Sequence, residues 1–298
     1  MTGLKAPLKI DLCMWTKNGE STLPKVLEQI DKVIPPENIC CKILVDDDSN
    51  DRTTEIAKEH GWKVYSNPHR GIPSGVNEAL MHVDRDFFAS FEQDIFLSPD
   101  WWKKIPHYMS NPQVICAQGI RVSSEPLLRV FDEWQHATHR GKLPIIVQGI
   151  DNNLFRTKLM RTVGVPDVCP ICADSALHKS ISQTPFKWIT DVNVVSLHIR
   201  RGLKESVYHQ IKLGTLCTQS PLCAANEPNL RSVFRIFVTS PLRAIQIAVT
   251  RNCPSAVWAY PLYRFYFVDA TLKFGREGYF DLAKKPKHSK TTKTKETT

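Results

Sequence analysis

Two short clusters of carboxylates carry the first chemical signal in the sequence. Asp46, Asp47 and Asp48 directly follow the apolar run ILV, and Glu92 and Asp94 follow the run FFASF. Carboxylates this close together repel one another unless a cation offsets their charge. Oxygen ligands favour Mg²⁺ or Mn²⁺, and such ions commonly bridge to the phosphates of a substrate. The clusters therefore predict a divalent-metal site for a phosphate-bearing substrate. The alternative for the first cluster is an Asp-rich turn that caps a helix.

Strands and helices alternate around these clusters. Short apolar runs predict strands at 9–15, 39–45, 62–66 and 87–91, and amphipathic spacing predicts helices at 22–33, 51–60 and 75–82. This alternation indicates an α/β fold with a mostly parallel central sheet. Ligands of such sheets bind outside the carboxyl ends of the strands. Both clusters follow strands, so we expect them to share one functional edge.

Charge is distributed unevenly along the 298 residues. Residues 200–298 contain 17 basic and 6 acidic side chains, whereas residues 1–199 have a net charge of −2. A uniformly basic nucleic-acid binder would not show this division, and the sequence has no recognised nucleic-acid motif, so we expect no nucleic-acid partner. We find neither an apolar leader nor a run of about 20 apolar residues, and therefore expect a cytoplasmic protein with reduced cysteines.

Three ordered motifs resemble those of family 2 glycosyltransferases. VDDDSNDRT (45–53) is similar to the nucleotide-binding stretch of that family, and GVNEAL (75–80) to a helix that follows it. FASFEQDIFLSPDWW (88–102) resembles the strand that carries the Asp-x-Asp metal motif. The resemblance covers roughly residues 8–200. It implies a nucleotide-binding fold of the GT-A type, with a catalytic domain over residues 1–205.

Carried over position by position, the resemblance implies the residues that bind the donor. Asp46 and Asp47 would contact the base and ribose of the nucleotide, and Thr16 and Asn18 would line the same pocket. Glu92 stands where the first Asp of Asp-x-Asp is usual. Its side chain is one methylene longer, so we group it with the nucleotide-binding residues, in contact with ribose, sugar or water.

The resemblance also implies a metal site. Asp94 matches the second Asp of Asp-x-Asp and would hold Mn²⁺ or Mg²⁺ against the diphosphate of a nucleotide sugar. His198 follows a predicted strand at 192–197, where related enzymes place a histidine near the metal. The alternative for His198 is a partly buried strand residue with a satisfied hydrogen bond.

The chemistry of an inverting transfer requires a carboxylate that takes the proton of the acceptor hydroxyl. Asp174 lies where the family often has its general base, and Ala173 replaces the customary Glu. The alternative for Asp174 is a helix N-cap. In the segment before it, Asp151 and Asn152 are implied to contact hydroxyls of the sugar or acceptor.

The last third of the chain is basic and rich in aromatic residues, a composition that suits a membrane interface. Segments 231–238 and 242–251 are predicted as short amphipathic helices separated by Pro241. We expect residues 206–283 to form a helical region at an anionic membrane surface on the cytoplasmic face, and 284–298 a disordered basic tail. The alternative is that these helices pack on the catalytic domain.

The sequence thus predicts a metal-dependent inverting glycosyltransferase that uses a nucleotide-sugar donor and a glycan or lipid-linked acceptor. The departures at Glu92 and Ala173 keep an alternative open, a non-catalytic protein of the same fold that binds a membrane or a complex. Cys169 and Cys172 form a CxxC pair, but the remaining cysteines do not complete the spacing of a zinc site. We therefore expect ordinary thiols there.

Overall fold

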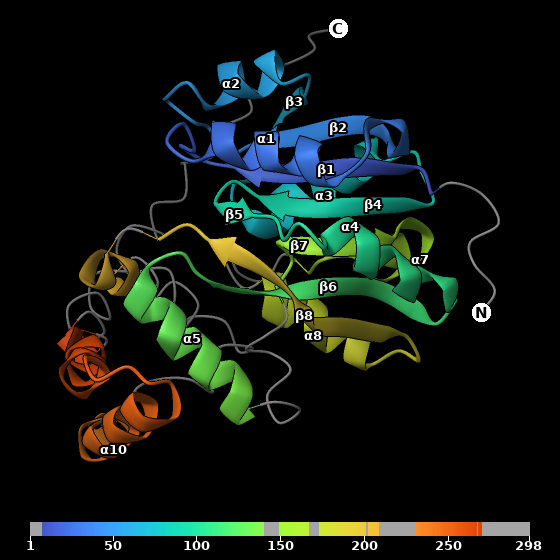
Figure 1. Cartoon of the computed structure of the whole chain (residues 1–298). Helices are drawn as coiled ribbons and strands as arrows, with labels where there is room; N and C mark the ends of the chain where they lie inside the picture. The colour runs from blue at the N-terminus through green and yellow to red at the C-terminus, as the bar shows by residue number, and fades with distance from the viewer. Residues whose placement is uncertain are drawn as a thin grey trace, which may run out of the picture.

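An eight-stranded sheet forms the centre of the structure (Figure 1). The computed structural model describes residues 8–139, 149–166, 173–200, 202–208, 230–266 and 268–269. In chain order the strands are β1 (Ile10–Thr16), β2 (Ile39–Asp46), β3 (Lys63–Ser66), β4 (Phe87–Glu92), β5 (Ile95–Phe96), β6 (Val114–Ser123), β7 (Asn152–Arg156) and β8 (Lys187–His198). Across the sheet their order is β3-β2-β1-β4-β7-β6-β8-β5.

Strands β1 to β4 form a parallel half, as the sequence predicts. β1 lies between β2 and β4 and runs parallel to both, and β3 runs parallel to β2. The register places Thr16 beside Asp46 and Trp15 beside Glu92. The chain therefore leaves β1, β2 and β4 at the same edge of the sheet, which brings the two carboxylate clusters to that edge.

The other half of the sheet mixes strand directions. β7 runs antiparallel to β4 and β6, whereas β6 runs parallel to β8. The short β5 pairs antiparallel with the end of β8, and Ile95 lies opposite His198. This pairing brings Asp94 beside His198, from which 104 positions of sequence separate it.

Helices cover both faces of the sheet. α1 (Leu23–Val33), α2 (Thr53–Glu59), α4 (Trp101–Lys104) and the 3-10 helix η2 (Ile105–Ser110) pack on one face, and α3 (Ile72–His82), α7 (Thr157–Val163) and α8 (Ala173–Ser182) pack on the other. In β1, Leu12 and Met14 enter the first core, and Cys13 and Trp15 enter the second. Successive side chains of a strand point to opposite faces, so a strand covered on both sides is apolar throughout.

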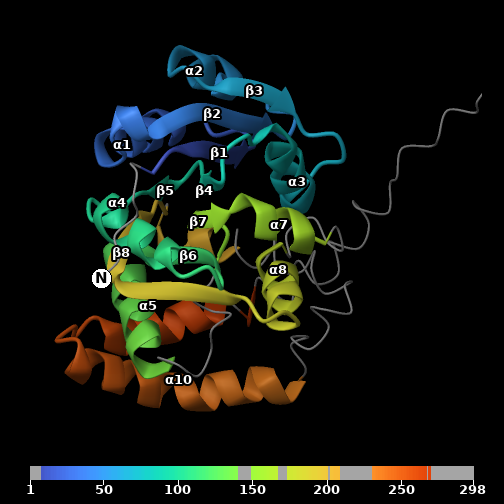
Figure 2. The ribbon, with the colours of Figure 1, turned by 90° about the vertical axis from the view of Figure 1, so that its right-hand side faces the viewer.

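α5 (Pro126–His139) lies between the sheet and the C-terminal helices (Figures 1 and 2). Its Phe131 shares a hydrophobic core with Ala244 and Ile247 of α10 (Leu230–Thr250) and with the helix at 256–266.

The prediction of two short helices divided by Pro241 is wrong, because α10 is continuous with Pro241 inside it. Proline removes one helical hydrogen bond, and the packing of Ala244 and Ile247 against α5 keeps the helix aligned beyond it.

Some predictions concern residues outside those described. They are the CxxC pair Cys169 and Cys172, the tail at 284–298 and much of the region 206–283. Among the helices that the structure describes, none is both long enough and apolar enough to cross a bilayer.

Candidate functional site

Asp46 ends β2 and is buried at the sheet edge. Its Oδ2 accepts a hydrogen bond from the Ser49 backbone N–H at 2.9 Å, and the Thr16 hydroxyl lies 3.4 Å from its Oδ1. Thr16 reaches this position because the register of β1 and β2 pairs the two residues. The carboxylate of Asp46 is thereby fixed between the loops that follow β1 and β2.

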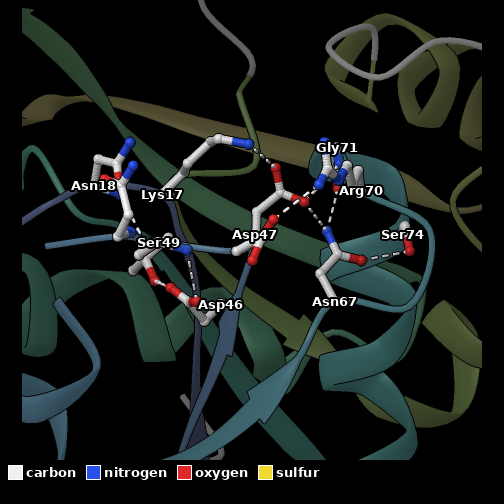
Figure 3. A network of polar contacts seen from close by, with 12 residues as sticks. Lys17, Asn18, Asp46, Asp47, Ser49, Asn67, Arg70, Gly71 and Ser74 are labelled. Atoms are coloured by element: carbon white, nitrogen blue, oxygen red, sulfur yellow. Dashed lines mark hydrogen bonds and ion pairs between the residues drawn. The ribbon is translucent and has the colours of Figure 1, made fainter. Parts of the chain in front are cut away.

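Asp47 is held by three donors (Figure 3). Its Oδ1 accepts hydrogen bonds from Asn67 Nδ2 at 2.8 Å and from the Gly71 backbone N–H at 3.0 Å. Its Oδ2 lies 3.1 Å from the ammonium of Lys17. Gly71 has a φ of 85° just before α3, a conformation that glycine adopts without strain. Asp47 therefore ties the loops after β1, β2 and β3 together.

Asn18 joins the loop after β1 to the loop after β2. Its backbone N–H donates to Ser49 Oγ at 2.8 Å, and its Oδ1 accepts from the Asn50 N–H at 3.0 Å. Asn18 adopts a φ of 50°, which asparagine tolerates better than most residues. We call the assembled group the polar cradle, defined by Thr16, Lys17, Asn18, Asp46, Asp47, Ser49, Asn67 and Gly71.

Gln93 connects the polar cradle to the second carboxylate cluster. The Lys17 backbone N–H donates to Gln93 Oε1 at 2.9 Å, and Gln93 Nε2 donates to the Lys17 carbonyl at 2.9 Å. Gly19 lies against the same side chain, and a Cβ on it would stand 2.6 Å from Gln93 Oε1. Because Gln93 lies between Glu92 and Asp94 in sequence, this contact sets the second cluster next to the first.

Asp94 and His198 form the pair most suited to a metal ion. His198 Nε2 lies 2.9 Å from Asp94 Oδ2, and His198 Nδ1 lies 3.0 Å from Arg200 Nη2. Burial pushes the pKa of Asp94 upward, but the interactions with His198, Arg200 and Arg121 together outweigh it, so that pKa lies below its usual value. Burial also lowers the pKa of His198, which favours the neutral imidazole that metals bind.

The donor set around this pair fits an ion that also takes ligands from its substrate. In the part of the chain that the structure describes, no three His, Cys, Asp or Glu side chains converge to hold a metal. Mg²⁺ and Mn²⁺ sites commonly use one or two protein ligands and complete their shell with water and phosphate oxygens. Asp94 and His198 match that arrangement.

Glu92 lies beside this pair in a strongly perturbed environment. Burial raises the pKa of Glu92 to about 7, and the negative charges of Asp94 and Asp174 add to the effect, whereas Arg121 opposes it. A carboxyl group that is half-protonated near neutral pH is typical of functional sites. A cation beside Asp94 would favour the ionised form of Glu92.

Asp174 lies in the first turn of α8. Its Oδ1 accepts a hydrogen bond from the Ile150 backbone N–H at 3.0 Å. Burial raises the pKa of Asp174, and the nearby charge of Arg121 partly offsets that rise. The helix begins at Ala173, so Asp174 stands inside it and its described hydrogen bond goes to another segment of the chain.

Arg121 is a functional candidate that the sequence reasoning missed. It extends from β6 and forms an ion pair with the buried Asp151. Its charge lowers the pKa of Asp94 and opposes the rise at Asp174. A Cβ on Gly149 would stand 2.1 Å from Arg121 Nη1, so the guanidinium passes directly over that glycine. The signal in the sequence was a single arginine in a strand that is otherwise uncharged.

Asp151 and Asn152 are both fully buried at the start of β7. Asp151 is the ion-pair partner of Arg121. Asn152 Oδ1 accepts from the Gly119 N–H at 3.0 Å, and its carbonyl accepts from Trp101 Nε1 at 2.8 Å. Among the described residues, Asp151 Oδ1 and Asn152 Nδ2 have no hydrogen-bond partner.

Comparison with known proteins agrees with this architecture. A sequence pattern described as Glycosyl transferase family 2 matches residues 11–183. A 4,4'-diaponeurosporenoate glycosyltransferase from Staphylococcus haemolyticus is 44% identical over 57 residues, which is 19% of this chain and 14% of that protein. The chain therefore matches only a small part of that relative's length.

Solved structures share the fold. A mannosyltransferase from Pyrobaculum calidifontis, in complex with GDP-Man and Mn²⁺, superposes with a TM-score of 0.61 at 16% identity, over 91% of this chain and 88% of that one. Glucosyl-3-phosphoglycerate synthase from Mycobacterium tuberculosis, in complex with Mn²⁺ and UDP, has a TM-score of 0.52 at 16% identity, over 74% and 81% of the two chains. The α/β fold with its mostly parallel sheet is thus the fold of known glycosyltransferases. Because the family pattern covers more than half of the sequence, the chain belongs to glycosyltransferase family 2.

Proposed function

We propose that the protein is a metal-dependent, inverting glycosyltransferase. It moves a sugar from a nucleoside-diphosphate sugar to a hydroxyl of a glycan or lipid-linked acceptor. The observation that most supports this proposal is the meeting of Asp94 and His198 beside Glu92, at the edge where Asp46 and Asp47 end β2. We call Asp94 and His198, which would hold one metal ion, the metal pair. The metal pair and the polar cradle, which is rich in hydrogen-bond acceptors, lie at one edge of the sheet. They suit a ligand that has a diphosphate at one end and a nucleoside at the other.

The polar cradle would bind the nucleoside. Thr16 and Asn18 line it, and the carboxylates of Asp46 and Asp47 would accept hydrogen bonds from the base and ribose hydroxyls. Backbone N–H groups and Asn67 already orient these carboxylates. Preorientation lowers the entropy lost when the nucleotide binds.

Asp94 and His198 would hold Mn²⁺ or Mg²⁺, and the imidazole ligand favours Mn²⁺. When bound, the ion supplies positive charge to the leaving diphosphate. Glu92, ionised beside that charge, would contact the ribose or sugar. These roles rest on the donor set and on the 2.9 Å approach of His198 to Asp94.

Asp174 would act as the general base. As the acceptor oxygen bonds to the anomeric carbon, Asp174 takes the hydroxyl proton and the diphosphate leaves with its electron pair on the opposite face. The raised pKa of Asp174 makes its carboxylate a better proton acceptor. Arg121 keeps that carboxylate from becoming protonated too readily.

α10 offers a surface for the membrane. Six apolar side chains spaced along one helical face are 51% to 77% exposed. We call this the outer face of α10, and it consists of Phe234, Phe237, Val238, Leu242, Ile245 and Val249. An exposed apolar stripe of this length marks an interaction surface. Arg235 and Arg243 lie on the same helix, and residues 200–298 carry a net charge of +11. This charge complements an anionic bilayer and would repel a second copy of the same basic surface.

Thermal unfolding with nucleoside diphosphates, with and without Mn²⁺, tests the catalytic proposal. We expect one nucleotide to raise the melting temperature, and Mn²⁺ to increase the shift. Asp174→Asn should keep this shift and lose sugar transfer. Nucleotide binding without any transfer or donor hydrolysis by the wild type would instead support a non-catalytic nucleotide-binding protein.

Sedimentation with lipid vesicles tests the membrane proposal. The full chain should sediment with vesicles that contain phosphatidylglycerol and remain in solution with pure phosphatidylcholine. Leu242→Glu combined with Val249→Glu should weaken binding at least about tenfold, because two exposed apolar side chains that would enter the bilayer are replaced by charges. Met81→Glu is the matched control, since Met81 is an exposed apolar residue of α3. Equal binding by the double variant would refute the membrane role, and a dimer lost in that variant would assign the face to a second copy.

A further inference from the structure

A cavity of about 150 Å³ lies where the catalytic sheet meets the C-terminal helices. The ends of β6 and β8 form one wall through Arg121, His198 and Arg200. α5, the segment 203–208 and the helix at 256–266 form the others. The cavity therefore shares residues with the metal pair and with the surroundings of Asp174, but lies on the side of the C-terminal helices.

Two buried polar atoms at this cavity lack partners among the described residues. They are Ser206 Oγ and His136 Nδ1. His136 Nε2 lies 3.1 Å from the Arg121 carbonyl, so Nε2 donates, and in the tautomer with its proton on Nε2 the Nδ1 atom is an acceptor. A buried polar atom without a partner costs about 1–3 kcal/mol. Both atoms would be satisfied by a hydroxyl group placed beside them.

Three larger side chains at the cavity can also form further hydrogen bonds. Asp132 Oδ2 accepts from the Ser123 N–H at 2.8 Å, which leaves Oδ1 available. Burial raises the pKa of Tyr263 to about 12, so its hydroxyl stays protonated and can donate. Arg200 touches His198 through Nη2, and within the described ranges no carboxylate lies close enough to form an ion pair with it.

Donors and acceptors are thus mixed around one small space. A hydroxyl both donates and accepts, so a ring or chain with several hydroxyls can satisfy Asp132 and His136 as acceptors and Arg200 and Tyr263 as donors. A phosphate or carboxylate offers acceptors alone and would face Asp132. An apolar group would leave every one of these atoms unpaired. The volume is about half of the 300 Å³ at which pockets for drug-sized ligands begin, so it suits one sugar-sized unit.

We propose that this cavity binds the hydroxylated end of the acceptor, a single sugar or polyol unit. The proposal rests on the glycosyltransferase mechanism above and names the chemistry of its acceptor. Asp132, Ser206 and Tyr263 would form hydrogen bonds to that unit from the helical side. Arg121 and His198 line the opposite side of the cavity, where His198 also contacts Asp94. An acceptor attached to a lipid would then place its sugar end here and its apolar part toward the C-terminal helices.

Saturation-transfer NMR on the full chain tests the proposal directly. The probes are the methyl glycosides of glucose, mannose and galactose, with EDTA present and no nucleotide. We expect at least one glycoside to bind. Tyr263→Phe should weaken it by between about twofold and tenfold, the range of one hydrogen bond, and Asp132→Asn by about tenfold or more. Tyr266→Phe, one helical turn away, and Glu133→Gln, next to Asp132 on α5, are the matched controls and should bind as the wild type does.

The outcomes separate this proposal from the donor site. Absence of any glycoside signal, or equal losses in the cavity variants and their controls, would each overturn it. Because the assay contains neither metal nor donor, failure of nucleotide binding leaves its result unaffected. If Asp132→Asn is unfolded by circular dichroism, Tyr263→Phe and Ser206→Ala decide, since each removes one hydrogen-bonding group without changing a charge.

Discussion

The imidazole Nε2 of His198 lies 2.9 Å from Oδ2 of Asp94, at the pairing of β5 with β8. On the other side of the ring, Nδ1 lies 3.0 Å from Arg200 Nη2. A guanidinium only donates hydrogen bonds, so Nδ1 accepts and the ring proton is on Nε2, directed at Asp94. If His198 held a metal ion through Nε2, its ring proton would have to be on Nδ1. Arg200 would then lose its contact with His198, and its guanidinium would be free for another acceptor.

Removing the carboxylate charge of this pair should weaken metal binding. We expect Asp94→Asn to weaken Mn²⁺ binding at least about tenfold, the lower end of the effect of supporting residues at metal sites. Mn²⁺ titration followed by thermal unfolding in the presence of a nucleoside diphosphate measures this. Asp100→Asn at the start of α4 is the control. Mn²⁺ affinity retained by Asp94→Asn would place the ion elsewhere.

The two neighbouring aspartates after Asp46 should differ in their effect on nucleotide binding. Asp47 is held by Asn67, Gly71 and Lys17, whereas Asp48 is exposed and paired with Arg70. We expect Asp47→Asn to weaken nucleoside diphosphate binding about tenfold, since hydrogen bonds to charged groups contribute about 1.5–3 kcal/mol. Asp48→Asn should change it little. Isothermal titration calorimetry compares the two, and equal losses would contradict the assignment.

Arg121 and its buried partner Asp151 should be energetically coupled. Arg121→Met or Asp151→Asn alone leaves one charge without its partner and should lower the free energy of unfolding by about 3 kcal/mol or more. The double variant should lose less than the sum of the two. Arg129→Met breaks an exposed pair with Glu133 and should cost less than about 1 kcal/mol. Urea denaturation gives all four values, and strict additivity would show that the pair is not coupled.

Glu92 should make stability depend on pH in an unusual direction. Its pKa is raised from 4.5 to about 7 in the folded protein. Between these values the folded state binds more protons than the unfolded state, so the Glu92 contribution to stability is present at low pH and is lost as pH rises. Glu92→Gln should remove this slope and be more stable than the wild type at pH 8, by on the order of 2 kcal/mol. Unfolding at pH 5 to 8 measures it, and an unchanged slope in the variant would contradict the assignment.

The parallel half of the fold was predictable because its signals are local. Strands β1, β2 and β4 are mostly apolar runs, and α1 carries its apolar residues at helical spacing. The carboxylate clusters were predictable for the same reason, since they follow those runs directly. The boundary of α3 was less accurate. The helix begins at Ile72, three residues before the predicted start, because Pro73 fits the first turn of a helix.

The residues that hold the carboxylates in place could not be predicted from local sequence patterns. Lys17 and Asn67 hold Asp47 from two other loops, and Arg121 reaches its carboxylates from β6. These contacts depend on strand order, which places β7 between β4 and β6, and no local pattern encodes that order. Pro241 misled the reading of α10, because tertiary packing against α5 outweighed its local effect.

The pairing of β5 with β8 also sets the order in which the site can be assembled. Every residue of the polar cradle lies between positions 16 and 71, whereas β8 begins at Lys187 and supplies His198 only at its end. During synthesis the cradle emerges from the ribosome more than a hundred residues before that histidine. In a nascent chain, the residues proposed to bind the nucleotide are therefore present well before the pair proposed to hold the metal is complete. Catalysis would thus require the complete sheet. A chain truncated before β8 keeps the residues of the polar cradle but lacks His198.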